Sequence, residues 1–287
     1  MAIDARRPEI FREIDRTTLT VSEQPLTGWA RLYENALLRK TVLLIVLALG
    51  WEIYARVVGN PLVFPTFSAT VAALGSALAS GELPRAAVYT ISLLLKGYAA
   101  GLVLAALLTA FASMSRIGAD LLETLTAMFN PLPSIALLPL ALIWFGLGDG
   151  AVIFVLIHAV LWAVALNTFS GFKSLSNTLR MVGRNYGLSP LGYIARILIP
   201  GAFPSILTGL KIGWAFAWRT LIAAELVFGV SSGSGGLGWY VFEKKNQLLI
   251  PEVFAGLLTV ILFGLLVENL IFRAIERRTV ERWGMQS

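Results

Sequence analysis

Four ionisable side chains stand within long apolar stretches of the sequence, where they could bind an ion, relay a proton or pair with one another. Lys211, Trp218 and Glu225 recur at seven-residue intervals, which places them on one stripe of a helix. Arg219 lies about 80° from that stripe, and Lys96 belongs to an earlier apolar stretch. Charges in such surroundings usually face a cavity or a partner. The stripe is therefore either the wall of a pathway or a set of structural ion pairs.

The single histidine, His158, stands in the middle of another apolar stretch. A hydrogen bond between two helices is the more common role for such a side chain, and Asn167 is interpreted in the same way. A polar group in such surroundings is also a candidate for the lining of a pathway. The candidates for a pathway lining are Lys96, His158, Lys211, Trp218, Arg219 and Glu225.

Several kinds of chemistry are excluded by composition. The chain has no cysteine, so disulfides, thiolate metal sites, iron–sulfur clusters and thiol catalysis are impossible, and one histidine is too few for a multi-histidine metal site. Residues 233–238 match a dinucleotide-binding glycine pattern, but that pattern works only between a strand and a helix of a soluble unit. Residues 170–174 resemble a phosphate-binding loop but have Phe172 where glycine is needed. We expect no cofactor, no metal, no ATP site and no enzymatic activity.

The elements that position these residues are membrane helices. Of the 287 residues, 57% are hydrophobic and 14% are charged, and the mean hydropathy is +0.76. Such a chain cannot cover a water-facing surface. A helix that crosses a bilayer needs about 20 apolar residues. Six stretches qualify, and the third is interrupted at Pro131–Pro133 and again at Pro139: about 41–58, 86–113, 119–146, 151–172, 202–229 and 253–272.

The basic residues orient the predicted bundle, because Lys and Arg stay on the cytoplasmic side. Most of them precede the first span, lie in the loop 173–200 or follow the last span, whereas the opposite side holds Arg85, Lys244 and Lys245. Both termini are therefore predicted to be cytoplasmic. The net charge of +6 follows this rule, so we expect a lipid bilayer and no nucleic acid as a partner. Residues 1–25 lack the apolar region of a signal peptide.

The predicted organisation has three parts. Residues 1–40 form a cytoplasmic N-terminal segment with an interfacial helix from Thr27 to Lys40. Residues 41–276 form the six-helix domain, with a short outer helix from Phe67 to Ser80 and a Gly/Ser-rich outer loop at 229–238. Residues 277–287 form a cytoplasmic tail.

The loop 173–200 has a specific pattern of residues. It predicts two short helical pieces broken at Gly187, with Ser189 as the cap and Pro190 at the start of the second piece. With Ile197 and Pro200, the spacing resembles the EAA loop of ABC importer permeases, although Met181–Gly183 departs from the Glu-Ala-Ala triplet. A short helix of this kind can fit a groove on a soluble partner. The candidate residues for coupling to an ATPase are Arg184, Gly187, Leu188, Ser189, Pro190, Ile197 and Pro200.

Two further segments extend the resemblance. The stretch 131–148, with its P-L-P and W-F-G-L-G elements, looks like the nitrate/sulfonate/taurine-type permeases. The segment with Trp218-Arg219, Ala224-Glu225 and Gly236-Leu237-Gly238 is similar to the same subfamily. One departure is Leu93, which stands where the subfamily has an arginine; Lys96 follows one turn later.

The resemblance implies an all-α membrane protein with the type I ABC importer permease fold and a cytoplasmic coupling-helix loop. It implies a homodimer in a bacterial inner membrane that imports a small, anionic solute by alternating access. ATPase subunits that bind ATP would lie on the cytoplasmic side, and an external solute-binding protein on the other. The alternative is a self-sufficient secondary transporter or channel with Lys96, Arg219 and Glu225 as an ion relay. That class favours inverted repeats with broken helices, but the sequence has no repeat and one broken span. An intramembrane enzyme would need a nucleophile–base pair or a metal cluster that the chain lacks.

Overall fold

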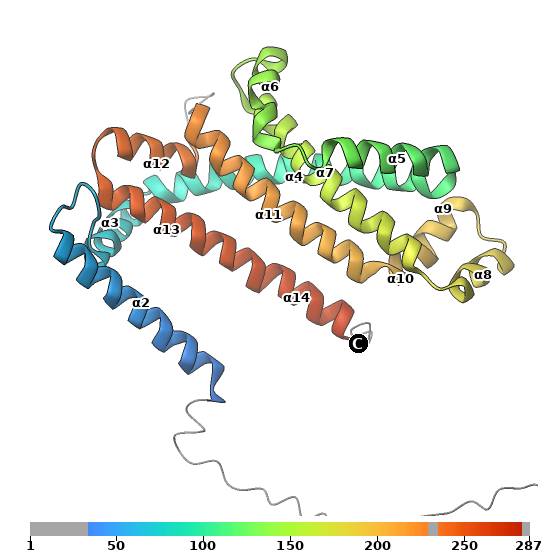
Figure 1. Cartoon of the computed structure of the whole chain (residues 1–287), viewed down its shortest axis with the longest axis horizontal. Coiled ribbons are helices and arrows are strands. Elements are labelled where there is room, and N and C mark those ends of the chain that lie inside the picture. Colours follow the sequence, from blue (N-terminus) through green and yellow to red (C-terminus); the bar gives the residue numbers. More distant parts are fainter. Residues whose placement is uncertain (1–33, 229–234, 283–287) are drawn as a thin grey trace, which may run out of the picture. The chain divides into compact units, whose positions relative to one another are not determined.

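The computed structural model describes residues 34–228 and 235–282, and these residues form helices without any strand (Figure 1). The all-α prediction is therefore confirmed. The α-helices are α2 (Ala36–Val58), α3 (Phe67–Ala79), α4 (Glu82–Met114), α5 (Arg116–Phe129), α6 (Leu138–Phe145), α7 (Asp149–Ser174), α8 (Asn177–Asn185), α9 (Pro190–Tyr193), α10 (Ile199–Gly201), α11 (Phe203–Phe228), α12 (Leu237–Asn246), α13 (Ile250–Leu266) and α14 (Arg273–Glu276). Short 3₁₀ or π segments are η2 (Ser134–Leu137), η3 (Ile194–Leu198), η4 (Val267–Phe272) and η5 (Arg277–Glu281).

The chain divides into two compact units, residues 1–50 and 51–287. The described part of the first unit contains the first half of α2, an apolar helix that already begins at Ala36 and includes Lys40. The rest of the predicted interfacial helix, residues 27–33, lies outside the described residues. All remaining helices belong to the second unit, which contains the candidate sites.

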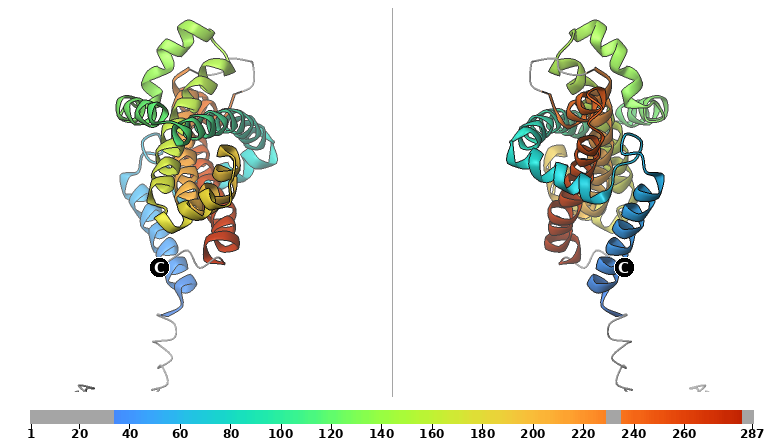
Figure 2. Two further views of the ribbon diagram at one scale, coloured as in Figure 1. Left: turned by 90° about the vertical axis from the view of Figure 1, so that its right-hand side faces the viewer. Right: turned by 90° about the vertical axis from the view of Figure 1, so that its left-hand side faces the viewer.

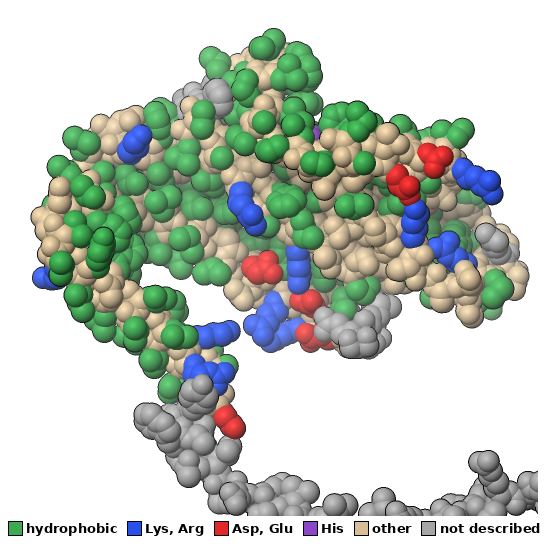
Figure 3. Space-filling model, in the orientation of Figure 1, with side chains coloured by type: hydrophobic (Ala, Val, Ile, Leu, Met, Phe, Trp, Pro, Cys, Tyr) green, Lys and Arg blue, Asp and Glu red, His purple; other side chains and the backbone are tan. Residues whose placement is uncertain are grey.

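Four helices are long and apolar enough to cross a membrane: 36–58, 82–114, 149–174 and 250–281. Two bent pairs, 116–145 and 190–227, raise the number of candidate spans to six. This agrees with the six predicted spans and with their approximate places in the sequence. Hydrophobic side chains cover much of the visible surface, as expected of helices that face lipid (Figure 3). The last helix continues to Glu281, beyond the predicted boundary at 276.

The third predicted span is not one interrupted helix. The segments 116–129 and 134–145 meet at 88°, with the break at residues 130–133. Pro131 and Pro133 lack the N–H groups that a continuing helix would use, and each disfavours helical backbone at the residue before it. Pro139 does not interrupt the chain again, contrary to the prediction, because it lies in the first turn of α6, where proline is favoured.

Helix α7 is the most buried of the candidate spans and packs against both α4 and α11 (Figure 2). Glycines make these contacts close. A Cβ atom on Gly97 of α4 would lie 2.5 Å from Cβ of Leu156, and one on Gly101 would lie 2.7 Å from Cβ of Val160. Gly209 and Gly213 of α11 approach α7 in the same way. Small residues four apart let two helix backbones approach within a membrane, which is the basis of this three-helix core.

The predicted short helix 67–80 is confirmed as α3, which ends at Ala79. Glu52 forms an ion pair with Arg56, at 2.6 Å, and also accepts a hydrogen bond from the backbone N–H of Ser68 at 3.0 Å. Trp51 donates to the carbonyl of Pro65 at 2.9 Å. These contacts attach the end of α2 to the start of α3.

Candidate functional site

Residues 173–200, which we call the coupling loop after the role predicted for them, contain the predicted break and cap. Gly187 follows α8 with a φ of +62°, in the left-handed region that favours glycine. The Ser189 hydroxyl then accepts a hydrogen bond from the N–H of Gly192 at 3.2 Å, and Pro190 occupies the first turn of α9. The second piece continues through η3 into α10, so it is longer than α9 alone.

The candidate coupling residues differ in exposure. Gly187, Ser189, Pro190 and Pro200 are exposed, whereas Leu188 and Ile197 are half-buried. Arg184 lies in α8, but its side chain is outside the description. Two exposed apolar residues, not predicted from the pattern, flank the break: Tyr186 at 80% and Leu191 at 66% exposure.

The two pieces of the loop pack on each other at Gly183. A Cβ atom there would lie 2.5 Å from the ring of Tyr193, so the position must be small. Met181 and Val182 beside it are exposed and carry no such restriction. The triplet Met181–Gly183 therefore departs from Glu-Ala-Ala but keeps a small residue at its third position, Gly183, where the two helical pieces are in contact.

Arg180 joins the coupling loop to the end of α7, a role that sequence analysis missed. Its guanidinium donates to the carbonyls of Phe172 and Lys173 at 2.8 and 3.1 Å, and to that of Leu175 at 3.3 Å. The last carbonyls of a helix have no partner within it, so this arginine caps α7. From the sequence, only the length of the Arg180 side chain and its position eight residues after Phe172 could have suggested this contact.

We expect Arg180→Ala to reduce solute-stimulated ATP hydrolysis by the assembled transporter without lowering the amount of the chain in the membrane. Each hydrogen bond from a charged donor is worth up to about 1.5–3 kcal/mol, and the variant loses three. Immunoblots of membranes and ATPase assays with the whole complex measure the two quantities. Arg278→Ala removes an exposed cation elsewhere and is the control. Equal stimulation in the two variants would contradict the positioning role of Arg180.

Most of the intramembrane candidates have partners in the structure. Lys211 pairs with Glu276 at 2.8 Å, and Lys96 lies 3.9 Å from Asp149. The Trp218 ring stacks on Phe263, with ring centroids 5.4 Å apart. The stripe through Lys211, Trp218 and Glu225 therefore meets a different neighbour at each position and does not line one cavity.

Glu225 is almost completely buried, at 5% exposure, and hydrogen bonds satisfy its carboxylate. The Thr90 hydroxyl donates to its oxygens at 2.8 and 3.0 Å, and the backbone N–H of Gly238 donates to Oε2 at 2.8 Å. Within the described ranges no lysine or arginine forms an ion pair with Glu225.

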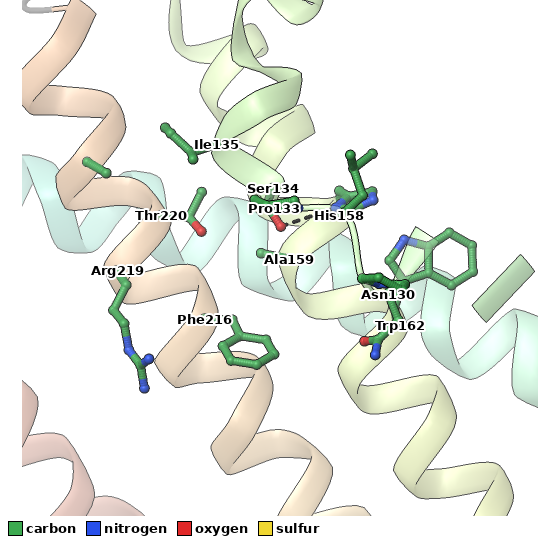
Figure 4. Close-up of a pocket in the computed structure, with 13 residues that line it drawn as sticks. Asn130, Pro133, Ser134, Ile135, His158, Ala159, Trp162, Phe216, Arg219 and Thr220 are labelled. Atoms are coloured by element: carbon green, nitrogen blue, oxygen red, sulfur yellow. Dashed lines mark hydrogen bonds between the residues drawn. The ribbon is translucent and has the colours of Figure 1, made fainter. Parts of the chain in front are cut away.

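A cavity of about 380 Å³ lies between α7, α11 and the proline-rich turn 130–135 (Figure 4). His158 and Trp162 line it from α7, and Phe216, Arg219 and Thr220 line it from α11. His158 Nδ1 lies 3.1 Å from Ser134 Oγ, which confirms the predicted hydrogen bond to another element. Asn167 instead donates to the carbonyl of Ala163 in its own helix at 2.7 Å. Of the six pathway candidates, the cavity brings together His158 and Arg219 only.

Arg219 is the unusual member of this cavity. It is exposed although it lies well inside α11, and its guanidinium lies 5.9 Å from the centroid of the Phe216 ring. In the part of the chain that the structure describes, it forms no ion pair. The same residues contain no group of three His, Cys, Asp or Glu side chains that could hold a metal ion.

Comparison with known proteins agrees with this architecture. Residues 97–281 match the family of binding-protein-dependent transport system inner membrane components. The taurine transport system permease protein TauC of Escherichia coli is 34% identical over 158 residues, which cover 55% of this chain and 56% of that protein. The nitrate import permease protein NrtB of Synechocystis is 31% identical over 175 residues, or 61% and 62%. A putative ABC transporter permease of Methanocaldococcus jannaschii is 28% identical over 223 residues, or 76% and 82%.

The family match contains the cavity, the coupling loop and Glu225 with Leu237 and Gly238, though not Thr90, and it extends over more than half of the chain. It decides against a self-sufficient secondary transporter or channel, because members of this family work with a solute-binding protein and an ATPase. The chain therefore belongs to the binding-protein-dependent transport system inner membrane components, as the multi-pass, non-catalytic permease component of an ABC importer.

Proposed function

We propose that two copies of this chain form the path by which a small anionic solute enters the cell, with both termini in the cytoplasm. The observation that carries the proposal is Arg219. An arginine in the middle of a membrane helix is unfavourable by about 2.5–3.5 kcal/mol or more when it faces lipid. A single chain leaves Arg219 exposed and without an acidic partner among the described residues. A water-filled path between two copies removes that penalty.

The chemistry of the cavity favours an oxyanion. The guanidinium group presents a planar fork of donors that matches carboxylate, sulfonate or nitrate oxygens. Thr220 and Ser134 add hydroxyl groups on two sides, and Phe216 and Trp162 supply apolar walls. A volume of about 380 Å³ is in the range of small-molecule sites. The relatives named for taurine and nitrate transport handle solutes with such oxygen-rich groups.

We further propose that the ATPase binds the coupling loop. Tyr186 and Leu191 present exposed apolar surface on both sides of Gly187, as a helix that enters a groove on a soluble partner requires. Arg184, Gly187, Leu188, Ser189, Pro190, Ile197 and Pro200 are the proposed coupling residues. Lys173 at the start of the loop forms an ion pair with Glu123 of α5, so the loop also contacts the helix before the bend.

Uptake by the complete transporter in proteoliposomes tests the anion path. Taurine, nitrate and ethanesulfonate serve as probes, each supplied with the solute-binding protein outside. We expect Arg219→Ala to lower uptake of the transported probe by about ten- to a hundredfold, the equivalent of one charged hydrogen bond. Arg219→Lys keeps the charge but loses the planar fork of donors, so we expect uptake between that of the unmodified chain and that of Arg219→Ala.

The matched control is Arg116→Ala, because Arg116 is exposed at the start of α5 and does not line the cavity. Its uptake is expected to equal that of the unmodified chain. Normal uptake by Arg219→Ala, with normal amounts in the membrane, would refute the assignment of Arg219 to the path.

A further inference from the structure

The buried cluster around Glu225 joins three helices that are distant in the sequence. Thr90 of α4 donates its hydroxyl proton to Glu225 of α11 and accepts a hydrogen bond from the N–H of Leu237, at 2.8 Å, at the start of α12. The N–H of Gly238 donates to Glu225 directly at 2.8 Å. Thr90 has 0% exposure and Leu237 has 0% exposure, so water cannot replace these bonds. One carboxylate and one hydroxyl thus hold the first turn of α12.

The glycines at the start of α12 fit this cluster and allow no larger residue. A Cβ atom on Gly236 would lie 2.0 Å from Oε1 of Glu225 and 2.4 Å from the Thr90 hydroxyl. A Cβ atom on Gly238 would lie 2.6 Å from Cβ of Glu225. Gly236 and Gly238 of the pattern 233–238 therefore let the backbone approach a buried carboxylate.

A second contact joins the other end of α12 to α4. Lys244 pairs with Glu82 at 3.0 Å, and both residues line a cavity of about 660 Å³ between the two helices. On its other side, α12 packs against α13, where a Cβ atom on Gly256 would lie 2.7 Å from Val241. Helix α12 is therefore held at both of its ends and along one face.

We propose that Thr90 and Glu225 fasten α12 to α4 and α11, so that these three helices move as one body during transport. Helix α11 begins directly after the coupling loop and ends next to Glu225, so it connects that loop to α12 at the opposite end. Separating α12 from the cluster would leave a buried carboxylate without partners, which is strongly unfavourable. Motion of the coupling loop is thus carried to α12, and contact at α12 is carried back to the loop. The proposal rests on the coupling role of the loop but not on the identity of the solute.

Distance measurements test the rigid connection directly. The chain has no cysteine, so Val88→Cys and Glu243→Cys place one pair of spin labels in each copy, on exposed positions of α4 and α12. An excess of unlabelled copies in the assembly leaves only the distance within one chain. Pulsed electron paramagnetic resonance compares the complete transporter without nucleotide and trapped with ATP and vanadate. We expect the same distance distribution within the chain in both states. A new peak in the trapped state would mean that α12 moves independently and would overturn the proposal.

Thr90→Val and Thr109→Val form a matched pair for the functional consequence. Both threonines are buried in α4, but the Thr109 hydroxyl donates only to Ala105 of its own helix, at 2.6 Å. We expect Thr90→Val to broaden the label distance and to lower the ATPase rate with loaded binding protein to the basal rate. Thr109→Val is expected to match the unmodified chain in both measurements. Full stimulation and one narrow distance in Thr90→Val would contradict the fastening role.

These results separate two kinds of failure. If the coupling role of the loop is wrong, Gly187→Val leaves ATPase stimulation unchanged. If only the fastening role is wrong, Gly187→Val removes stimulation and Thr90→Val does not. If Thr90→Val does not accumulate in the membrane, Glu225→Gln is used in the same assays instead. This variant keeps the shape of the Glu225 side chain and one of its two acceptor oxygens. The distance measurement on the otherwise unmodified chain needs neither variant.

Discussion

Gly187→Val is expected to abolish solute-stimulated ATP hydrolysis by the assembled transporter while the chain reaches the membrane at its normal level. Gly187 has a φ of +62°, and a β-branched residue there is strained by about 1–3 kcal/mol. No atom lies within 4 Å of an added Cβ, so the effect is one of backbone conformation and not of space. The strain tilts or unfolds α9 relative to α8, whereas the membrane helices keep their packing.

Two controls isolate this cause. Gly187→Asn adds a side chain of similar size that tolerates the left-handed region, so it should keep most of the stimulation. Gly59→Val places the same strain, at a φ of +65°, in the turn after α2, and should not affect stimulation. Immunoblots of membranes and ATPase assays with loaded binding protein measure both quantities. Stimulation by Gly187→Val equal to that of Gly187→Asn would make the loop a passive linker.

The membrane helices could be predicted because length and apolar composition decide them. The 88° bend between α5 and η2–α6 could not, although the prolines that cause the break are plain in the sequence. Proline removes helix hydrogen bonds but does not fix the direction of the next segment. That direction follows from packing, because Leu138 and Ala141 of α6 are buried together with Ala151 and Val155 of α7.

The coupling loop was predicted more accurately than the pathway, and the difference has a physical reason. Its break and cap depend on neighbours within a few residues, so Gly187, Ser189 and Pro190 carry the information locally. The stripe on α11 depends on distant helices. Lys211 meets Glu276, 65 residues away, and Glu225 meets Thr90, 135 residues away. A helical wheel shows which residues share a face but not which helix covers each turn of it.

The glycines of the helix contacts were open to prediction from sequence, whereas those at the start of α12 were not. Residues 97 and 101, and 209 and 213, have the spacing of close helix packing, which a sequence displays openly. Gly236 and Gly238 follow no such rule, since the atoms they avoid belong to Thr90 and Glu225. Only the folded chain brings those atoms together. The reason for the glycines at 236 and 238 was therefore not predictable from the sequence.

Gly97→Ala is expected to destabilise the chain clearly, although it adds a single methyl group. The new Cβ would lie 2.5 Å from Cβ and 2.8 Å from Cδ1 of Leu156, a residue with 0% exposure. Cβ of Leu156 is fixed to the backbone of α7, so α4 and α7 must separate. Overpacking of a tight core costs about 1–3 kcal/mol, and loss of the close approach also weakens the contacts at Gly101.

Gly264→Ala is the matched control, because its added Cβ would meet only Nε1 of Trp218, at an ordinary 3.6 Å. Both variants add one methyl group to a glycine in a membrane helix. Fluorescence-detected size exclusion after heating measures the temperature at which half of the detergent-solubilised chain is lost. We expect a clear decrease for Gly97→Ala and almost none for Gly264→Ala. Equal temperatures for the two would mean that α4 and α7 do not pack through Gly97 as the structure has it.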